Sequence, residues 1–206
     1  MNIIQTLTEK PWLTARGKVD DLYHGGAFFL PTAKLGLRVF LGVVTALFLL
    51  LINAYRMRMG LADWRPLAEP WLLWPNTGVL ILSSIAMQWA SVGARREQMN
   101  GVKAGLLAGG VLAWVFLAGQ LFAWRQLAAS GYFAATNPAS AFFYLLTALH
   151  GVHLLGGLVA WGKTTAKVWR HDATVGQVRL SVELCAVYWH FLLVVWLVLF
   201  GLLLLT

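Results

Sequence analysis

The chain has 206 residues, of which 59% are hydrophobic and only 12% are charged, whereas soluble domains are nearer half apolar and a quarter charged. This composition, with a mean hydropathy of +0.69, excludes a disordered chain, a disulfide-rich secreted scaffold and most soluble enzymes, and it indicates a protein of the lipid bilayer. The formal net charge is +8; in a membrane protein such an excess marks cytoplasmic loops rather than nucleic-acid binding. The only cysteine, Cys185, cannot form an intrachain disulfide.

Residues 1–34 differ in composition from the rest of the chain. They hold seven charged side chains together with the helix breakers Pro11 and Pro31, and no apolar run precedes Leu35. We therefore expect a polar N-terminal tail over residues 1–34 without a cleavable signal peptide. Within this tail, the apolar residues Phe28–Leu30 either lie along the membrane surface or belong to a solvated segment, and the sequence leaves both readings open.

Residues 35–206 are dominated by continuous apolar runs, each about 20 residues long, as a membrane-spanning helix requires. A transmembrane barrel would instead show alternating segments of about ten residues. We therefore predict an all-α membrane bundle of five transmembrane helices. The runs are Leu35–Tyr55, Asn76–Ala94, Val102–Trp124, Ala139–Trp161 and Val182–Leu205.

The distribution of lysine and arginine predicts the orientation of these helices, because cytoplasmic loops carry the excess of both. The N-terminal tail and the second and fourth loops hold most of them, whereas the first and third loops hold few. We therefore expect a cytoplasmic N-terminus and an external C-terminus. The tail and even loops carry Lys10, Arg16, Lys18, Lys34, Arg95, Arg96, Lys103, Lys163, Lys167, Arg170 and Arg179, and the odd loops carry Arg56, Arg58, Arg65 and Arg125.

Two polar sequences are typical of helix starts. Asn76-Thr77 offers a capping side chain for the second helix, and Asn137-Pro138 offers an N-cap followed by a proline at the first helical position.

Small and aromatic residues indicate how the helices pack. Gly105 and Gly109 lie four apart on one face of the third helix, which allows close approach of another backbone. Trp189 and Trp196 lie seven apart on one face of the fifth helix, where packing in the core is favoured over contact with a partner helix or lipid.

The ionisable side chains within the predicted helices are few, and each is a candidate functional residue. His150 and His153 share a face of the fourth helix, Glu183 lies at the start of the fifth, and His190 lies further in. His153 and His190 are both about 12 Å from the inner ends of their helices.

These three histidines allow two interpretations. One is a metal or heme site, since imidazole is the commonest metal ligand. The other is hydrogen bonding across helices or to lipid headgroups, which is favoured because no carboxylate lies at that depth and Cys185 is nearer the surface. The shortage of carboxylates also disfavours a proton relay, so the residues alone favour a non-catalytic helical subunit.

Three stretches, in this order along the chain, resemble subunit III of heme–copper oxidases in its short, five-helix form. The first is Trp74-Pro-Asn-Thr-Gly-Val-Leu-Ile-Leu-Ser-Ser84, followed by Trp89. The second is Ser140-Ala-Phe-Phe-Tyr-Leu-Leu-Thr-Ala-Leu-His150-Gly-Val-His153-Leu-Leu-Gly-Gly157. The third is Glu183-Leu-Cys-Ala-Val-Tyr188-Trp189-His190-Phe191, continuing to Trp196.

The resemblance implies a non-catalytic accessory subunit of a respiratory terminal oxidase in a bacterial inner membrane. Such a subunit packs beside catalytic subunit I and other oxidase subunits, binds phospholipid, and has no nucleic-acid partner. It implies no cofactor in this chain, with hemes and copper in the partner catalytic subunit. The matching positions are a lipid-binding or inter-helix polar cluster of His150, His153, Glu183 and His190, and packing or subunit-interface residues Asn76, Thr77, Trp89, Tyr188, Trp189 and Trp196.

The chain departs from the family pattern at three places where a carboxylate is usual: Val43-Val44, Ala123 and Leu193. These departures put proton handling in doubt and indicate a divergent branch. Two alternatives therefore stand beside the oxidase subunit: an accessory protein of nitric oxide reductase, and a small membrane protein that binds heme or metal through His150, His153 and His190.

Overall fold

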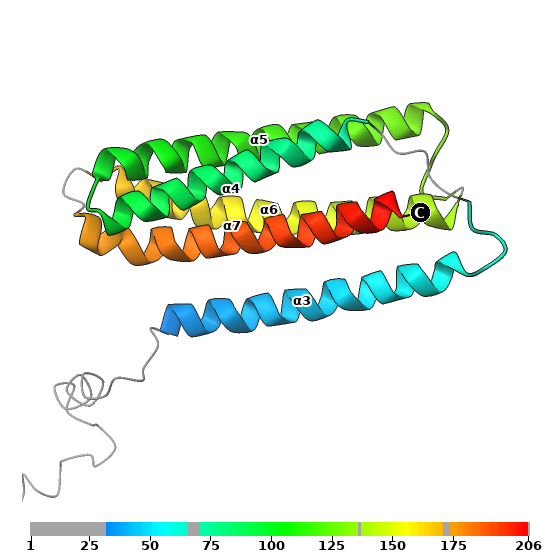
Figure 1. Ribbon diagram of the computed structural model, residues 1–206, viewed down its shortest axis with the longest axis horizontal. Helices are drawn as coiled ribbons and strands as arrows, with labels where there is room; N and C mark the ends of the chain where they lie inside the picture. Colours follow the sequence, from blue (N-terminus) through cyan, green and yellow to red (C-terminus); the bar gives the residue numbers. More distant parts are fainter. Residues whose placement is uncertain (1–31, 66–70, 136, 171–173, 206) are drawn as a thin grey trace, which may run out of the picture. The chain divides into compact units, whose positions relative to one another are not determined.

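The computed structural model describes residues 32–65, 71–135, 137–170 and 174–205. These residues form five α-helices and no strand (Figure 1), and each helix is long and apolar enough to cross a membrane. The all-α prediction with five spanning helices is confirmed. The helices are α3 (Thr32–Met59), α4 (Leu73–Arg95), α5 (Met99–Ala129), α6 (Pro138–Val168) and α7 (Val175–Leu204).

The helices extend beyond most of the apolar runs that predicted them. α5, for example, has 31 residues, which gives a length of about 46 Å at the rise of an α-helix. This exceeds a hydrocarbon core of about 30 Å, so the polar residues at its ends continue the helix beyond that thickness.

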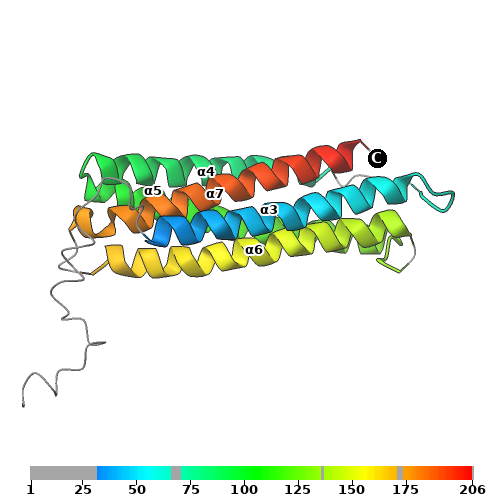
Figure 2. The same ribbon diagram turned by 90° about the horizontal axis from the view of Figure 1, so that it is seen from below.

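The chain divides into two compact units, Met1–Arg38 and Val39–Thr206. Of the first unit only the start of α3 is described, so the prediction of a polar tail lies almost entirely outside the described residues, as does the alternative for Phe28–Leu30. The second unit contains the rest of α3 and all of α4–α7, whose successive helices run antiparallel (Figures 1 and 2).

Small residues bring α4 and α5 together. A Cβ atom added at Gly105 would lie 2.6 Å from the backbone nitrogen of Ala90 and 2.7 Å from the carbonyl oxygen of Ala86. Near the connecting turn, a Cβ at Gly93 would lie 3.1 Å from the nitrogen of Val102. The predicted role of Gly105 in close helix packing is therefore confirmed, since only hydrogen fits there.

Large aromatic side chains fill the space between α5, α6 and α7. Trp189 and Trp196 of α7 are completely buried, as is Phe116 of α5, whose ring centroid lies 4.9 Å from that of Trp196. The Trp161 indole donates a hydrogen bond of 2.8 Å to the Leu106 carbonyl and lies where a Cβ at Gly110 would have to be. The tryptophan face of α7 is thus core, as the sequence favours.

The part of α3 in the second unit buries only a narrow strip of its surface. Val44, Phe48 and Tyr55 pack into a cluster with Leu146 of α6 and Leu199 of α7. The opposite side of the helix exposes large apolar residues such as Leu50, which is 70% exposed. This exposure is what hydrocarbon around a spanning helix accommodates.

The capping prediction for α4 is wrong. The helix begins at Leu73, so Asn76 and Thr77 lie inside it, and no side chain caps it. The physical reason is Pro75, which fits within the first helical turn because the N–H groups there have no intrahelical partner. The prediction for α6 is confirmed, because Asn137 is the N-cap, accepts a hydrogen bond from the Ala139 nitrogen, and precedes a proline.

The close approach at Gly105 predicts the effect of a single methyl group. We expect Gly105→Ala to lower the free energy of unfolding by about 1–3 kcal/mol, because the methyl group would meet the backbone of α4. Gly156→Ala is the matched control, since a Cβ at Gly156 of α6 has nothing within 4 Å. The measurement is thermal unfolding of the purified chain in detergent; equal midpoints for the two variants would contradict the proposed packing.

Candidate functional site

Several polar side chains of α4 contact α7 along the length of the two helices. Three hydroxyl residues of α4 each contact a ring of α7, and the pairs follow the antiparallel register of the helices. Trp196 Nε1 donates to Thr77 Oγ1 at 2.9 Å, Trp189 Nε1 donates to Ser83 Oγ at 2.9 Å, and His190 Nδ1 lies 2.5 Å from Ser84 Oγ.

Two of these hydroxyl groups pass the hydrogen bond on to a backbone carbonyl. Ser83 Oγ accepts from Trp189 and donates to the carbonyl of Gly109 in α5 at 2.7 Å. Thr77 Oγ1 accepts from Trp196 and donates to the carbonyl of Leu73 at 2.7 Å. Each buried indole N–H is therefore satisfied, which the interior of a membrane protein requires. Ser83 also joins three helices through one oxygen atom.

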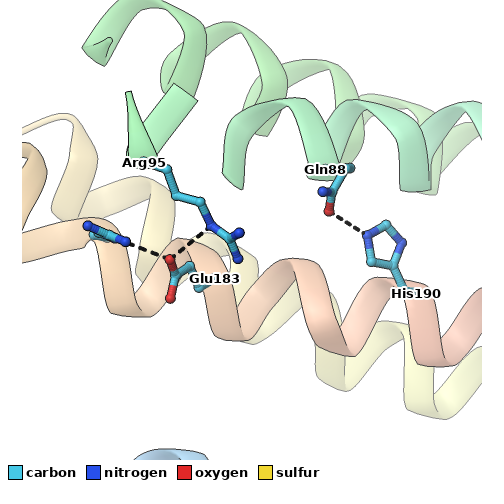
Figure 3. Close-up of polar contacts among 5 residues, drawn as sticks. Gln88, Arg95, Glu183 and His190 are labelled. Atoms are coloured by element: carbon cyan, nitrogen blue, oxygen red, sulfur yellow. Dashed lines mark hydrogen bonds and ion pairs between the residues drawn. The ribbon is translucent and has the colours of Figure 1, made fainter. Parts of the chain in front are cut away.

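His190 bridges two residues that lie one turn apart on α4. Its Nε2 is 2.9 Å from Gln88 Oε1 (Figure 3). Its Nδ1 is 2.5 Å from Ser84 Oγ. The amide oxygen can only accept, so Nε2 carries a hydrogen and donates it, while Nδ1 accepts from the serine hydroxyl. Both ring nitrogens of a neutral imidazole are thus satisfied.

Glu183 joins the charged ends of α4 and α7. Its Oε1 accepts from Arg95 Nε at 3.3 Å and from Arg179 Nε at 3.2 Å (Figure 3). The arginine side chains are 60% and 53% exposed, whereas that of Glu183 is 18% exposed. Because the arginines are exposed, each ion pair contributes at most about 1 kcal/mol to the free energy of unfolding. The pair with Arg95 links the end of α4 to α7.

His150 and His153 take no part in these hydrogen bonds between α4 and α7. His150 is completely buried between Phe116, at 5.9 Å between ring centroids, and Trp196, at 5.2 Å. Among the described residues neither of its ring nitrogens has a hydrogen-bond partner. His153 instead packs against Phe48 of α3, at 5.5 Å, and its Nδ1 lies 2.8 Å from the Leu149 carbonyl.

The three histidines therefore do not converge on one point. His150 lies among rings of α5 and α7, His153 contacts α3, and His190 contacts α4. Within the described ranges no group of three histidine, cysteine or carboxylate side chains is placed to hold a metal ion. Their arrangement supports the interpretation as separate inter-helix contacts and gives no geometry for shared coordination.

Most of the predicted packing residues lie inside the fold. Asn76, Thr77, Tyr188, Trp189 and Trp196 are buried. Tyr188 donates a hydrogen bond of 2.9 Å to the carbonyl of His153. Trp89 differs from the others, because it is 68% exposed on α4. The interior contacts thus stabilise this chain itself, and Trp89 alone of the six has a side chain that is free to meet a partner.

The residues that complete these contacts were not chosen as site residues from the sequence. Ser83, Ser84 and Gln88 are neutral and small or flexible, so they give no strong signal alone. The available signal was the spacing of Ser84 and Gln88, which lie four apart and so share one face. Recognising their partner requires the register of α4 against α7.

The positions at which the family that the sequence resembles usually has a carboxylate differ in their exposure. Val43 of α3 is 64% exposed, and Ala123 of α5 is completely buried. Leu193 is partly buried on α7. None of these side chains can carry a proton.

The family model described as cytochrome c oxidase subunit III matches residues 57–205. The chain is 31% identical over 176 residues to cytochrome c oxidase subunit 3 of Thermostichus vulcanus, covering 82% of this chain and 85% of that protein. It is 33% identical over 173 residues to the protein of the same name from Synechocystis sp., covering 80% of this chain and 72% of that protein.

The chain belongs to the cytochrome c oxidase subunit III family. The resemblance read from the three sequence stretches is confirmed, since all three lie within the matched region. Membership supports the function expected from the sequence, that of an accessory subunit of a respiratory terminal oxidase. The five spanning helices make it an integral membrane protein.

The hydrogen bonds of Ser83 predict that its hydroxyl group stabilises the fold. We expect Ser83→Ala to lower the free energy of unfolding by about 1–3 kcal/mol, because it leaves the buried Trp189 N–H and a helix carbonyl without their partner. Thr45→Val is the control: Thr45 is exposed and bonds only to the carbonyl one turn earlier, so a change within about 0.5 kcal/mol is expected. Unfolding by denaturant in detergent measures both; a loss for Ser83→Ala no larger than for the control would refute the role.

Proposed function

We propose that this chain packs beside the heme- and copper-bearing catalytic subunit I of a respiratory oxidase and stabilises it in a bacterial inner membrane. In this proposal the chain itself binds no heme or metal, has no nucleic-acid partner, and retains phospholipid on its surface. Its contribution to electron transport to oxygen is structural.

The observation that carries this proposal is the use made of the polar groups in α4–α7. The hydroxyl groups of Thr77, Ser83 and Ser84 in α4 hydrogen-bond to side chains of α7. Glu183 is paired with two arginines at the helix ends. Catalysis within the membrane would need ionisable groups directed at a substrate, whereas these groups hold helices together.

The proposed lipid contacts follow from the surface of the chain. Large apolar side chains are exposed on every described helix, as hydrocarbon requires. At the Glu183 end, Arg95 and Arg179 are more than half exposed, and cations at that level attract anionic headgroups. His150, His153, Glu183 and His190 act in this proposal through inter-helix contacts, with Glu183 placing the arginines for a headgroup.

The proposal predicts what accompanies the chain out of the membrane. A tagged full-length chain, extracted from native membranes in mild detergent, is expected to carry a heme-bearing oxidase subunit with it. The measurements are mass spectrometry of the copurified chains and a reduced-minus-oxidised spectrum of the complex. Heme bands together with an oxidase catalytic subunit support the proposal.

Two results of the same experiment would replace it. Copurification with a nitric oxide reductase subunit would transfer the role to nitric oxide reduction, for which the absence of carboxylates at Val43, Ala123 and Leu193 is the motivating observation. Heme retained by the chain without any partner would mean that His150, His153 or His190 are ligands, against their separate contacts.

The proposed orientation, with the N-terminus in the cytoplasm, predicts which turns accept a membrane-impermeant thiol reagent. Cys185 is the only cysteine and is buried, so the natural chain provides an unreactive background. On intact cells with a permeabilised outer membrane, Ser130→Cys between α5 and α6 is expected to react. Arg96→Cys between α4 and α5 is expected to react only after the inner membrane is opened. The reverse pattern would invert the topology.

A further inference from the structure

One amide nitrogen on the outer surface of α4 has no hydrogen-bond partner among the described residues. Gln88 is exposed, and its oxygen accepts the hydrogen bond from His190 at 2.9 Å. Its amide nitrogen makes no hydrogen bond to any described residue. Because His190 holds the oxygen, the two N–H groups of the amide are left directed away from the ring (Figure 3).

The position of Gln88 along α4 places this amide within the hydrocarbon. It lies about 10 Å along the helix from Arg95 and about 22 Å from Leu73 at the rise of an α-helix. Both distances exceed the reach of a glutamine side chain to either helix end. Acyl chains cannot accept a hydrogen bond, so the bare N–H groups would remain unsatisfied against lipid.

The residues around Gln88 form a surface of short, branched side chains. The outward residues of these two adjacent helices form a surface that we call the α4/α7 face. Its residues are Ile81, Ile85, Gln88, Val187, His190 and Val194. Ile85, Val187 and Val194 are 57%, 50% and 58% exposed. Branched side chains have few rotamers, so they lose little entropy when another helix packs on them.

The outward surfaces of α5 and α6 provide the comparison. The exposed residues of α5 between Ala104 and Phe122 are hydrocarbon side chains except for Trp114, whose indole carries an N–H, and those of α6 between Leu145 and Ala160 are hydrocarbon side chains or glycine. Within the described part of α4–α7 and away from the helix ends, Gln88 is the exposed side chain that carries an amide, whereas Trp89 and Trp114 expose indole rings. Lipid satisfies the hydrocarbon surfaces of α5 and α6, whereas the α4/α7 face presents the two N–H groups of an amide.

We propose that the α4/α7 face binds a transmembrane helix of the oxidase catalytic subunit, and that the Gln88 amide nitrogen donates a hydrogen bond to an oxygen acceptor on that helix. The acceptor is a backbone carbonyl or a hydroxyl or amide oxygen. The occupant follows from chemistry: an N–H donor at this depth needs an acceptor inside the hydrocarbon, and protein supplies one there. His190 is a positioning residue, because its Nε2–H fixes the amide orientation.

Photocrosslinking in native membranes tests which surface meets the catalytic subunit. Benzoylphenylalanine is placed in the full-length tagged chain at Ile85 or Val194 on the α4/α7 face, and at Val111 of α5 or Val159 of α6 as controls. All four positions are exposed apolar residues. Adducts with the heme-bearing subunit are expected from the first pair and at much lower yield from the second.

The inference rests on the proposed function, and the unmodified tagged chain separates the two. If that chain carries no heme-bearing subunit, the proposed function fails. If it does carry one, the following results overturn the α4/α7 face alone: adducts from the control pair at equal or higher yield, adducts with lipid only at Ile85 and Val194, or adducts only with a second copy of this chain.

A substitution tests the hydrogen bond itself. Gln88→Met keeps the length of the side chain and removes its donors, so the amount of catalytic subunit retained per tagged chain in detergent washes is expected to fall about threefold. Gln126→Met, at an exposed position near the end of α5, is the matched control and is expected to retain the full amount. The unfolding midpoint of each variant shows whether the chain itself is intact. Full retention by a folded Gln88→Met chain would overturn the proposed bond.

Discussion

The structure depends on the rule that a polar group inside a membrane must find its partner within the protein. The clearest case is Ser83, whose single oxygen accepts from the Trp189 indole of α7 and donates to the Gly109 carbonyl of α5. Because the serine itself belongs to α4, one hydroxyl group fixes the relative rotation of three helices. The glycines and alanines between α4 and α5 then serve this contact, since a bulkier surface would hold the helices too far apart.

The same rule describes two of the three histidines, whereas buried His150 has no hydrogen-bond partner among the described residues. His190 meets an acceptor and a donor on α4, and His153 bonds to its own helix and packs on Phe48. A metal site would require imidazoles that share a direction, together with outer partners that orient them. The helices instead direct the three rings into different interfaces, where each ring contacts side chains of another helix.

The sequence predicted the helices well because continuous apolar runs and Asn137-Pro138 are local signals. It failed at the start of α4, where a proline within the first turn moved the boundary ahead of Asn76. It recognised His190 and Trp189, yet it could not supply their partners. Pairing Trp189 with Ser83 requires the register between α4 and α7, which no local pattern contains. Depth estimates placed His153 and His190 at one level without revealing that they face opposite neighbours.

The distribution of satisfied and unsatisfied groups finally separates folding from association. Inside α4–α7 the hydroxyl groups of Thr77, Ser83 and Ser84 are used for packing, and the outer surfaces of α5 and α6 are mostly hydrocarbon. Gln88 combines the two situations, because its oxygen completes the interior network through His190 while its nitrogen is directed outward. A group anchored in this way cannot turn back to satisfy itself without breaking the histidine bond. The network that fixes α4 against α7 thereby also fixes the direction of the donor, so the fold prepares a surface for another subunit at no further cost in side-chain entropy.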